Sequence, residues 1–352
     1  MATPTFGVFD HIEGIPGTPT HELFRDRLEL IRLADEAGFG GFHFAEHHGS
    51  DLCLAPNQEL FIAAASQITT RIRLGPMVKL LPLHHPVRIL EDLCVADQLT
   101  GGRLDFGVGR GVAPIEHAWF GSDWTEGRER FEDTLAIICN ALATGEISSE
   151  GSRYYDFPTV PLATGPLQDP IPFWYPGNPA VAGRHGMSLM WPGPVPEDVY
   201  ETYLEAWESH RGDGLRVDGP DSRPRVGITM LVAIAPSEEE ALDIARRGMT
   251  GLVRRAEAVH ARDRLILSEA DCKAALRPLH AILAHMEDAI AAGAGTTDQI
   301  AERFAAILEP GLVDHVALQL PTGDMTYDEA RRTLELFAAE VKPQLERASL
   351  AA

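Results

Sequence analysis

The sequence has few cysteines, and none of them is placed to bind a metal or to form a disulfide framework. The four cysteines in 352 residues are Cys53, Cys94, Cys139 and Cys272, and no two of them form a CxxC pair. Widely spaced cysteines are typical of proteins in a reducing compartment, where thiols stay free. We therefore expect free, mostly buried thiols and a cytoplasmic protein.

The chain also lacks basic runs, long apolar runs and a recognisable targeting segment. There are 30 Lys and Arg residues against 52 Asp and Glu, which gives a net charge of −22. Nucleic-acid binding normally needs a basic face, and a membrane-spanning helix needs about 18 apolar residues in a row. The first residues, MATPTFGVFD, have no basic segment followed by an apolar core. We expect neither a nucleic-acid partner nor a membrane partner.

The sequence does contain a regular alternation of strand-like and helical segments. Short apolar runs alternate with segments whose apolar residues recur every three or four positions. This pattern predicts an α/β fold, a (β/α)8 barrel built as one domain by residues 1–352. Two departures are expected, namely an insertion at 145–170, which is rich in proline, and a long helical segment at 248–292. The predicted strands cover residues 5–9, 41–45, 71–80, 104–108, 171–175, 187–191, 225–234 and 313–320.

An open doubly wound sheet is the alternative fold, and it would carry a glycine-rich dinucleotide-binding turn after its first strand. The dense glycine cluster in this chain is 107–111, GVGRG, which follows the fourth predicted strand. A GxGxxG motif would need glycine where Val112 stands, and we expect Pro114 to prevent a helix from starting at once. The sequence therefore favours the barrel, in which ligands bind at the carboxyl ends of the strands.

Glu46, His47 and His48 directly follow the second predicted strand. A carboxylate with two histidines at a strand's carboxyl end favours a functional site over a structural role. Side chains alternate along a strand, so only one of the two histidines should point into the barrel mouth. A zinc site would need further ligands, which His84 and His85 could supply, but no HxxxH or HExxH helix is present. We therefore predict no metal.

Two further loops have the residues of a phosphate site. Arg110 stands between Gly109 and Gly111, where a ligand can approach the backbone closely and a guanidinium can bind phosphate. Gly177 and Asn178 precede a predicted helix, whose free N–H groups would attract an anion. The alternatives are a surface arginine and an ordinary Asn cap. The two loops follow successive strands of the main pattern, so together they favour a phosphate pocket.

Aromatic residues stand at the ends of the fifth and sixth predicted strands. Trp174, Tyr175 and Trp191 could wall a flat ring system, whereas Trp119, Phe120 and Trp124 lie in a polar loop. A phosphate-binding site, a flat apolar slot and a histidine at one rim of the barrel together indicate a phosphorylated aromatic cofactor.

With these features in view, the chain resembles the bacterial-luciferase superfamily of flavin-dependent monooxygenases over nearly its whole length. That resemblance implies a (β/α)8 barrel that commonly forms dimers, so we expect a homodimer. The segments that carry it are FAEHH (44–48), RIRLGPMVKLLPLHHPVR (71–88), EDLCVADQLTGGRLDFGVGRG (91–111), FGSD (120–123), WYPGNPAVAGRHG (174–186) and VDHVALQLPTGDMTYDEA (313–330).

The resemblance also implies roles for single residues. His47 matches the active-site histidine and Arg110 the phosphate-binding arginine. Met77 and Val78 match the segment that lies against the isoalloxazine ring, where a bulge or an unusual peptide bond is expected. Gly109 stands where luciferase has a reactive cysteine, which argues against light emission. Gly177 and Asn178 match the position of the other phosphate contacts, although the luciferase Glu-Ser pair is missing.

The implied activity is that of a two-component monooxygenase. A separate flavin reductase would supply reduced FMN, and O2 would then oxygenate a small organic substrate. His47 would act as an acid/base or as a hydrogen-bond donor. The alternatives are a hydride-transfer oxidoreductase that uses a deazaflavin, and a flavin-binding protein without catalysis. Residues 248–293 are either a lid over the mouth or a plain packing helix pair.

Overall fold

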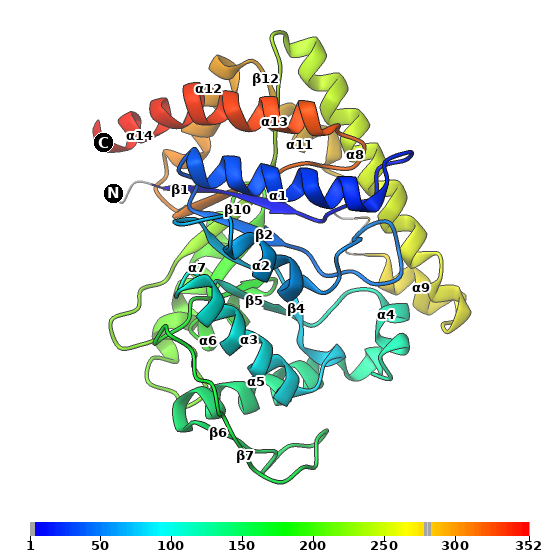
Figure 1. Cartoon of the computed structure of the whole chain (residues 1–352), viewed down its shortest axis with the longest axis vertical. Helices are drawn as coiled ribbons and strands as arrows, with labels where there is room; N and C mark the ends of the chain where they lie inside the picture. Colours follow the sequence, from blue (N-terminus) through cyan, green and yellow to red (C-terminus); the bar gives the residue numbers. More distant parts are fainter. Residues whose placement is uncertain (1–3, 278–279, 281–282, 352) are drawn as a thin grey trace.

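Parallel strands form the centre of the molecule and helices surround them (Figure 1). The computed structural model describes residues 4–277, 280 and 283–351. In that part of the chain the main sheet has nine strands, in the order β3-β2-β1-β13-β10-β9-β8-β5-β4, with neighbouring strands parallel. Their bounds are β1 Thr5–Asp10, β2 Gly41–Phe44, β3 Arg73–Pro76, β4 Lys79–Leu80, β5 Phe106–Gly109, β8 Phe173–Pro176, β9 Ser188–Pro192, β10 Val226–Leu231 and β13 His315–Gln319.

The sheet closes because β3 and β4 are consecutive pieces of one strand position. β3 pairs with β2, whereas β4 pairs with β5, and Leu74 in β3 also bridges to Leu104 just before β5. The peptide bond between Met77 and Val78, which separates the two pieces, is cis. The nine described strands therefore occupy eight positions, and the predicted (β/α)8 barrel is confirmed.

The helices begin and end largely where their capping residues predict. Pro86 is the first residue of α3, and Gly101 ends it with φ 65°, a left-handed conformation that glycine adopts without strain. Thr296 and Thr326 form the expected capping boxes of α12 and α13. The main helices are α1 Thr20–Glu36, α2 Gln58–Ser66, α3 Pro86–Thr100, α5 Gly127–Thr144, α6 Pro179–Arg184, α7 Glu197–Ser209, α8 Glu238–His260, α11 Met286–Gly293, α12 Thr297–Leu308, α13 Tyr327–Leu336 and α14 Lys342–Ala351.

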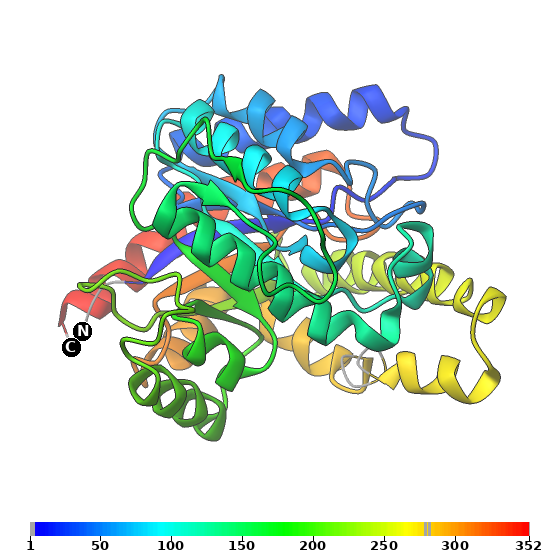
Figure 2. The same cartoon turned by 90° about the horizontal axis from the view of Figure 1, so that it is seen from below.

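The predicted insertion at 145–170 lies outside the barrel, at the bottom of Figure 1 and facing the viewer in Figure 2. It contains a short antiparallel pair, β6 (Glu146–Ile147) with β7 (Val160–Pro161). The sequence did not predict this pair, because two-residue strands are too short to produce a recognisable alternation.

Two helical predictions need correction. Residues 114–119, expected to belong to a polar loop, form helix α4 (Pro114–Trp119). Pro114 is its first residue, where the missing N–H costs no helical hydrogen bond, so proline starts this helix instead of preventing it. The predicted segment 248–292 is not one unit, since it begins inside α8 and continues through η3 (Asp263–Leu265), α9 (Glu269–Ala275) and α11. Residues 278–279 and 281–282 of it lie outside the described residues.

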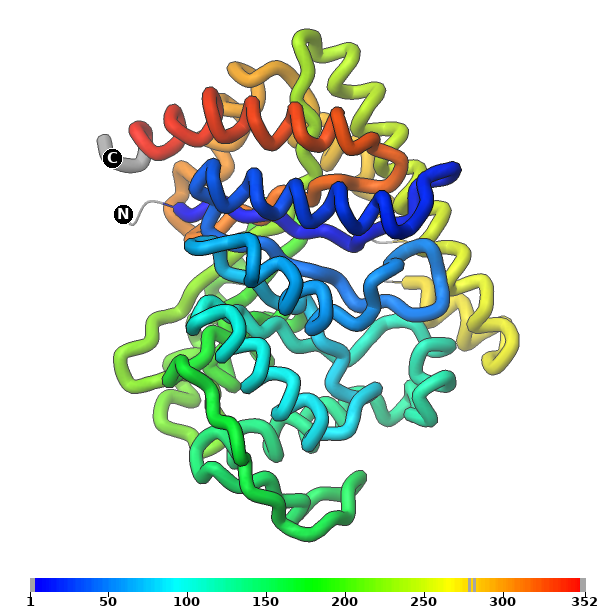
Figure 3. Tube along the Cα trace, viewed as in Figure 1, coloured from blue at the N-terminus to red at the C-terminus, as the bar shows by residue number. Residues whose placement is uncertain are grey.

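The apolar core fills the layer between the strands and the helices. Inside the barrel, Met77, Trp174 and Met190 form a smaller buried cluster, with Phe9 and Val78 packed against it. The start of β1 and helix α14 both lie near the amino ends of the strands (Figure 3). Among the described residues, no helix combines the length and the apolar character that crossing a membrane requires.

Candidate functional site

A cavity of about 660 Å³ opens at the carboxyl ends of the strands, which face the side where α4 and α9 lie in Figure 1. This end is where barrels of this kind bind their ligands. Seven of the eight predicted site residues line the cavity, coming from the loops or ends of β2, β3, β4, β5 and β8. They are His47, Met77, Val78, Gly109, Arg110, Gly177 and Asn178.

Trp191 is the predicted site residue that the structure does not bring into this group. In the described part of the chain it is absent from the cavity lining and packs against the outer core. Its neighbour Met190 belongs to the cluster inside the barrel. Alternation along β9 explains the difference, because adjacent side chains point to opposite faces of a strand.

His47 is held at the cavity by a buried carboxylate from α4. Its Nδ1 lies 3.3 Å from Oε1 of Glu116, and the same oxygen accepts the backbone N–H of His48 at 2.8 Å. Burial favours the neutral imidazole, but the hydrogen bond and charge of Glu116, helped by the charges of Glu46 and Glu13, raise the pKa of His47 above its ordinary value. With Nδ1 engaged by Glu116, Nε2 is the ring nitrogen left for a ligand. His48 does not line the cavity, so only one of the two adjacent histidines faces it, as expected.

A second histidine, His11, stands beside this pair. Its ring stacks on the His47 ring with centroids 6.0 Å apart, and it also lines the cavity. Burial, together with the neighbouring His47, lowers the pKa of His11 to about 3, so it remains neutral across the physiological range. The cavity thus contains one imidazole that is kept neutral and one whose protonation is favoured.

Met77, Val78 and Gly109 line one part of the cavity, which we call the slot. Met77 and Val78 form one wall, and Gln58 holds the segment by donating from Nε2 to the carbonyls of Phe44 (2.7 Å) and Val78 (3.2 Å). A Cβ on Gly109 would stand 2.5 Å from Cγ2 of Val78, closer than real Cβ contacts come. The Val78 side chain therefore packs directly on the backbone of Gly109, and any larger residue at this position would displace it.

One end of the cavity is positively charged. Arg110 and Arg128 both line it and both are exposed, and neither guanidinium takes part in an ion pair or hydrogen bond within the described residues. Glu132 lies there too, but His185 donates to it at 2.8 Å, and this hydrogen bond lowers the pKa of the Glu132 carboxyl. Two uncommitted guanidinium groups fit a phosphate, for which arginine has the right geometry.

The helix start at Asn178 contributes less than expected to this end. Oδ1 of Asn178 accepts the N–H groups of Ala180 (2.9 Å) and Val181 (3.4 Å), so the side chain caps α6 itself. The two amides are therefore already satisfied. Any phosphate at this rim would depend mainly on the two arginines.

Several lining residues were not found from the sequence. Glu116, Arg128 and His11 stand in segments that were treated as loops or as ordinary helix surface. Arg128 follows Gly127 at the start of α5, and an arginine in the first turn of a helix, where the dipole disfavours it, was the available signal. For Glu116 the signal was masked, because the helix that carries it was not predicted.

The loop after α8 touches the mouth without lining the cavity. Asp263 accepts the N–H of Ile115 at 2.9 Å, and Arg262 donates to the carbonyl of Gly49. None of the described residues from 248 to 292 is among the lining residues. The role of this segment as a lid remains a prediction.

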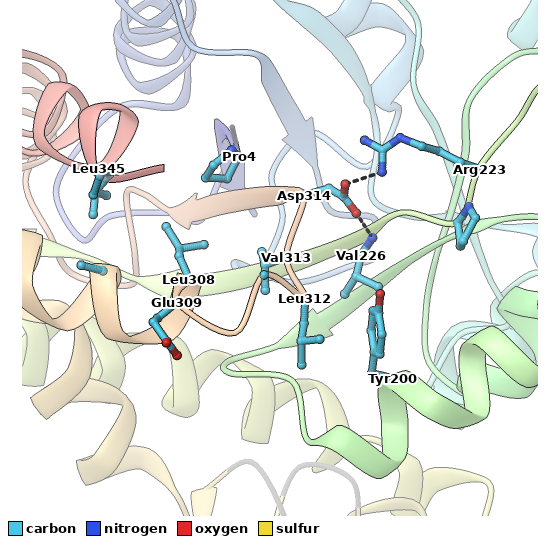
Figure 4. Close-up of a pocket in the computed structure, with 14 residues that line it drawn as sticks. Pro4, Tyr200, Arg223, Val226, Leu308, Glu309, Leu312, Val313, Asp314 and Leu345 are labelled. Atoms are coloured by element: carbon cyan, nitrogen blue, oxygen red, sulfur yellow. Dashed lines mark hydrogen bonds and ion pairs between the residues drawn. The ribbon is translucent and has the colours of Figure 1, made fainter. Parts of the chain in front are cut away.

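A second cavity, of about 450 Å³, lies at the opposite end of the barrel (Figure 4). There Asp314 accepts hydrogen bonds from Arg223 (2.7 Å) and from the backbone N–H of Val226 (2.9 Å). None of the predicted site residues lines it. The arrangement secures the starts of β10 and β13.

Comparison with known proteins decides the family. A family model described as luciferase-like monooxygenase matches residues 5–315. The chain belongs to the luciferase-like monooxygenase family. The named relatives that it matches are monooxygenases, and the chain is accordingly an enzyme.

A curated relative and two solved structures resemble the chain along most of their length. The oxygenase component of a flavin-dependent trigonelline monooxygenase from Acinetobacter baylyi is 26% identical, over 96% of this chain and 94% of that protein. The oxygenating constituent of 3,6-diketocamphane monooxygenase of Pseudomonas putida was solved with FMN. It matches with a TM-score of 0.70 at 20% identity, over 97% of this chain and 98% of that chain. An F420-dependent secondary alcohol dehydrogenase matches with a TM-score of 0.71 at 17% identity, over 98% of this chain and 99% of that chain. The two structural likenesses establish the fold alone.

Proposed function

We propose that this protein is the oxygenase component of a two-component monooxygenase that uses reduced FMN. The observation that supports this most directly is that His47, the slot at Gly109 and the guanidinium groups of Arg110 and Arg128 all face one cavity. Its relative from Acinetobacter baylyi bears the name of an oxygenase component. A separate flavin reductase would then be its partner.

Each part of the cavity has a task in this reaction. Arg110 and Arg128 would hold the phosphate of FMN, and Met77, Val78 and Gly109 would line the part of the cavity that holds its ring. Reduced FMN supplies the two electrons with which O2 gives one oxygen atom to the substrate and one to water. His47, oriented by Glu116, would present Nε2 to the cavity as a hydrogen-bond donor, and the apolar walls would limit access of water.

A test follows labelled oxygen from O2 into the product. The purified protein is mixed with an NADH-driven flavin reductase, FMN and a panel of ketone, terpene and aromatic substrates, and the products are analysed with 18O2. Incorporation of one labelled atom is expected, and it should be lost in His47→Ala while FMN binding is kept. Labelled product at an unchanged rate in His47→Ala would remove this residue from the mechanism.

A second candidate is hydride transfer with a deazaflavin, which the shared fold of the F420-dependent dehydrogenase supports. The two cofactors differ in reactivity toward oxygen, so they can be distinguished without knowing the substrate. Titration of the protein with reduced FMN and with reduced F420, followed by oxygen consumption, separates the two functions.

We also propose that the protein works as a homodimer through the exposed face of α2 and α3. Those helices pack against each other and expose Leu60 (71%), Ile68 just after α2 (42%), Val95 (47%) and Leu99 (45%). Apolar side chains gathered on neighbouring helices are typical of an interface.

The four cysteines are free, three of them buried, which agrees with a cytoplasmic location.

A further inference from the structure

Three side chains beside the flavin cavity converge on one point. Oε1 of Glu46 lies 2.9 Å from Nε2 of His48 and 2.5 Å from Nε2 of His84. A ligand atom from each of these residues lies within 4.8 Å of the other two. We propose that Glu46, His48 and His84 bind a divalent transition-metal ion of the zinc class.

The donor atoms select this class of ion. Two imidazole nitrogens and one carboxylate oxygen suit zinc and its neighbours, whereas Mg²⁺ and Ca²⁺ prefer a shell of oxygen atoms. Three protein ligands leave a coordination position for water. With bonds of about 2.0–2.1 Å, neighbouring ligands of a tetrahedral ion stand roughly 3.3 Å apart, so side-chain shifts of under about 1 Å would suffice.

The carboxylate of Glu46 is already fixed in the orientation that such a site needs. Its side chain is fully buried, and Oε2 accepts the backbone N–H of Leu80 at 2.8 Å, which leaves Oε1 directed at the two imidazoles. Partners of this kind hold metal ligands in place. The buried cation Lys79 is paired with Glu59 at 2.8 Å, and its charge also favours the ionised carboxylate of Glu46.

The site is open to ions from solvent. The His48 and His84 side chains are 13% and 18% exposed. The ring of Phe120 lies over both, with centroid distances of 4.5 Å to His48 and 5.5 Å to His84. An ion can therefore enter without opening the core, and an aromatic ring partly covers it once bound.

The bound ion would join two loops of the barrel mouth. Glu46 and His48 lie in the loop after β2, and His84 lies in the loop before α3. His47 stands between the first two ligands, so the ion would fix the backbone of the residue that faces the cavity. The prediction of no metal rested on the absence of ligands at helical spacing, whereas folding brings His84 in from a different loop.

Zinc titration of the protein without a histidine tag, after treatment with a chelator, tests the site. Isothermal titration calorimetry with ZnCl2 should give one ion per chain, and zinc should raise the unfolding temperature. Binding should weaken about 100-fold or more in His84→Ala, because loss of an outer partner alone costs 10–100-fold. Glu46→Gln should behave in the same way.

His85→Ala is the matched control. His85 is the adjacent histidine, but its ring packs against Tyr155 and Phe157 and is not one of the three ligands. Its replacement should leave zinc affinity and stoichiometry unchanged. Far-UV circular dichroism verifies that all variants fold, and the partial exposure of His84 makes its replacement tolerable.

The alternative is that the two histidines only donate Nε2–H groups to Glu46, as a hydrogen-bond network without an ion. In that case the wild-type protein would bind no stoichiometric zinc, or His84→Ala would bind it as tightly as wild type. Either result would overturn the proposal. Neither result depends on the flavin or on oxygenase activity, so the proposed function is tested separately.

Discussion

The positive end of the cavity makes the sharpest prediction, because FMN and riboflavin differ only by the phosphate. Arg110 and Arg128 line the cavity and have no other ionic partner in the described residues. Replacing either by alanine should weaken FMN binding while riboflavin binding stays the same. The ratio of the two dissociation constants therefore isolates the phosphate contact from all others.

The size of the effect follows from the geometry. A hydrogen bond to a charged group contributes about 1.5–3 kcal/mol, and the exposure of both guanidinium groups places each contact near the lower figure. Since 1.4 kcal/mol is tenfold in affinity, each single variant should lose about 10-fold in FMN affinity. The double variant should lose roughly 100-fold and should bind FMN and riboflavin about equally.

Fluorescence or absorbance titration of anaerobic, dithionite-reduced flavins measures both constants. Arg130→Ala is the matched control, since Arg130 lies on the same helix but stacks on Tyr154 and Tyr155 and does not line the cavity. If the FMN-to-riboflavin ratio survives in the double variant, the phosphate does not bind at this end. The proposed orientation of the cofactor would then be wrong.

Three further predictions address the slot, the dimer and acid stability. Gly109→Ala should weaken FMN and riboflavin binding alike, because its Cβ would meet Val78 Cγ2 at 2.5 Å, and parallel losses for the two flavins distinguish it from the arginine variants. Leu60→Glu should convert dimers to monomers in light scattering, and an unchanged mass would exclude the α2–α3 face. Burial, with the nearby His43, lowers the pKa of His315 in the folded protein to about 3, whereas in the unfolded chain this pKa is near 6.5. Below pH 6.5 the unfolded state therefore binds more protons than the folded state. The free energy of unfolding falls as the pH drops through this range. Between pH 7 and pH 5 His315 should lower the free energy of unfolding by about 2 kcal/mol, and His315→Gln should lose that much less in urea unfolding. Equal losses in both proteins would refute the assignment.

The sequence revealed most of the fold because the barrel repeats one local pattern. Apolar runs and caps such as Thr296 and Thr326 mark each unit, and they depend only on near neighbours. The split of the third strand at Met77 and Val78 was expected from the family resemblance alone, since nothing in the local pattern specifies a cis peptide.

The site was predicted less completely, for a physical reason. His47 and Arg110 follow strands directly, so the strand ends place them. Glu116 and Arg128 reach the cavity through α4 and α5, whose orientation depends on packing that local patterns do not contain. Trp191 was predicted to face the cavity and does not. Which side chains of β9 point inward depends on its pairing with both neighbouring strands, in which Leu189 lies opposite Tyr175 and Val226.

The cluster of Met77, Trp174 and Met190 under the slot has an experimental use. Trp174 is buried at 1% exposure and in one cluster with Met77 and Val78, which line the cavity. An oxidised flavin absorbs at the wavelengths where tryptophan emits, so a flavin ring bound in the slot would quench the fluorescence of Trp174 by energy transfer. The ultraviolet emission of the protein should therefore dim as flavin arrives, and Trp174→Phe should remove most of that response, which provides an optical readout of occupancy that needs no substrate.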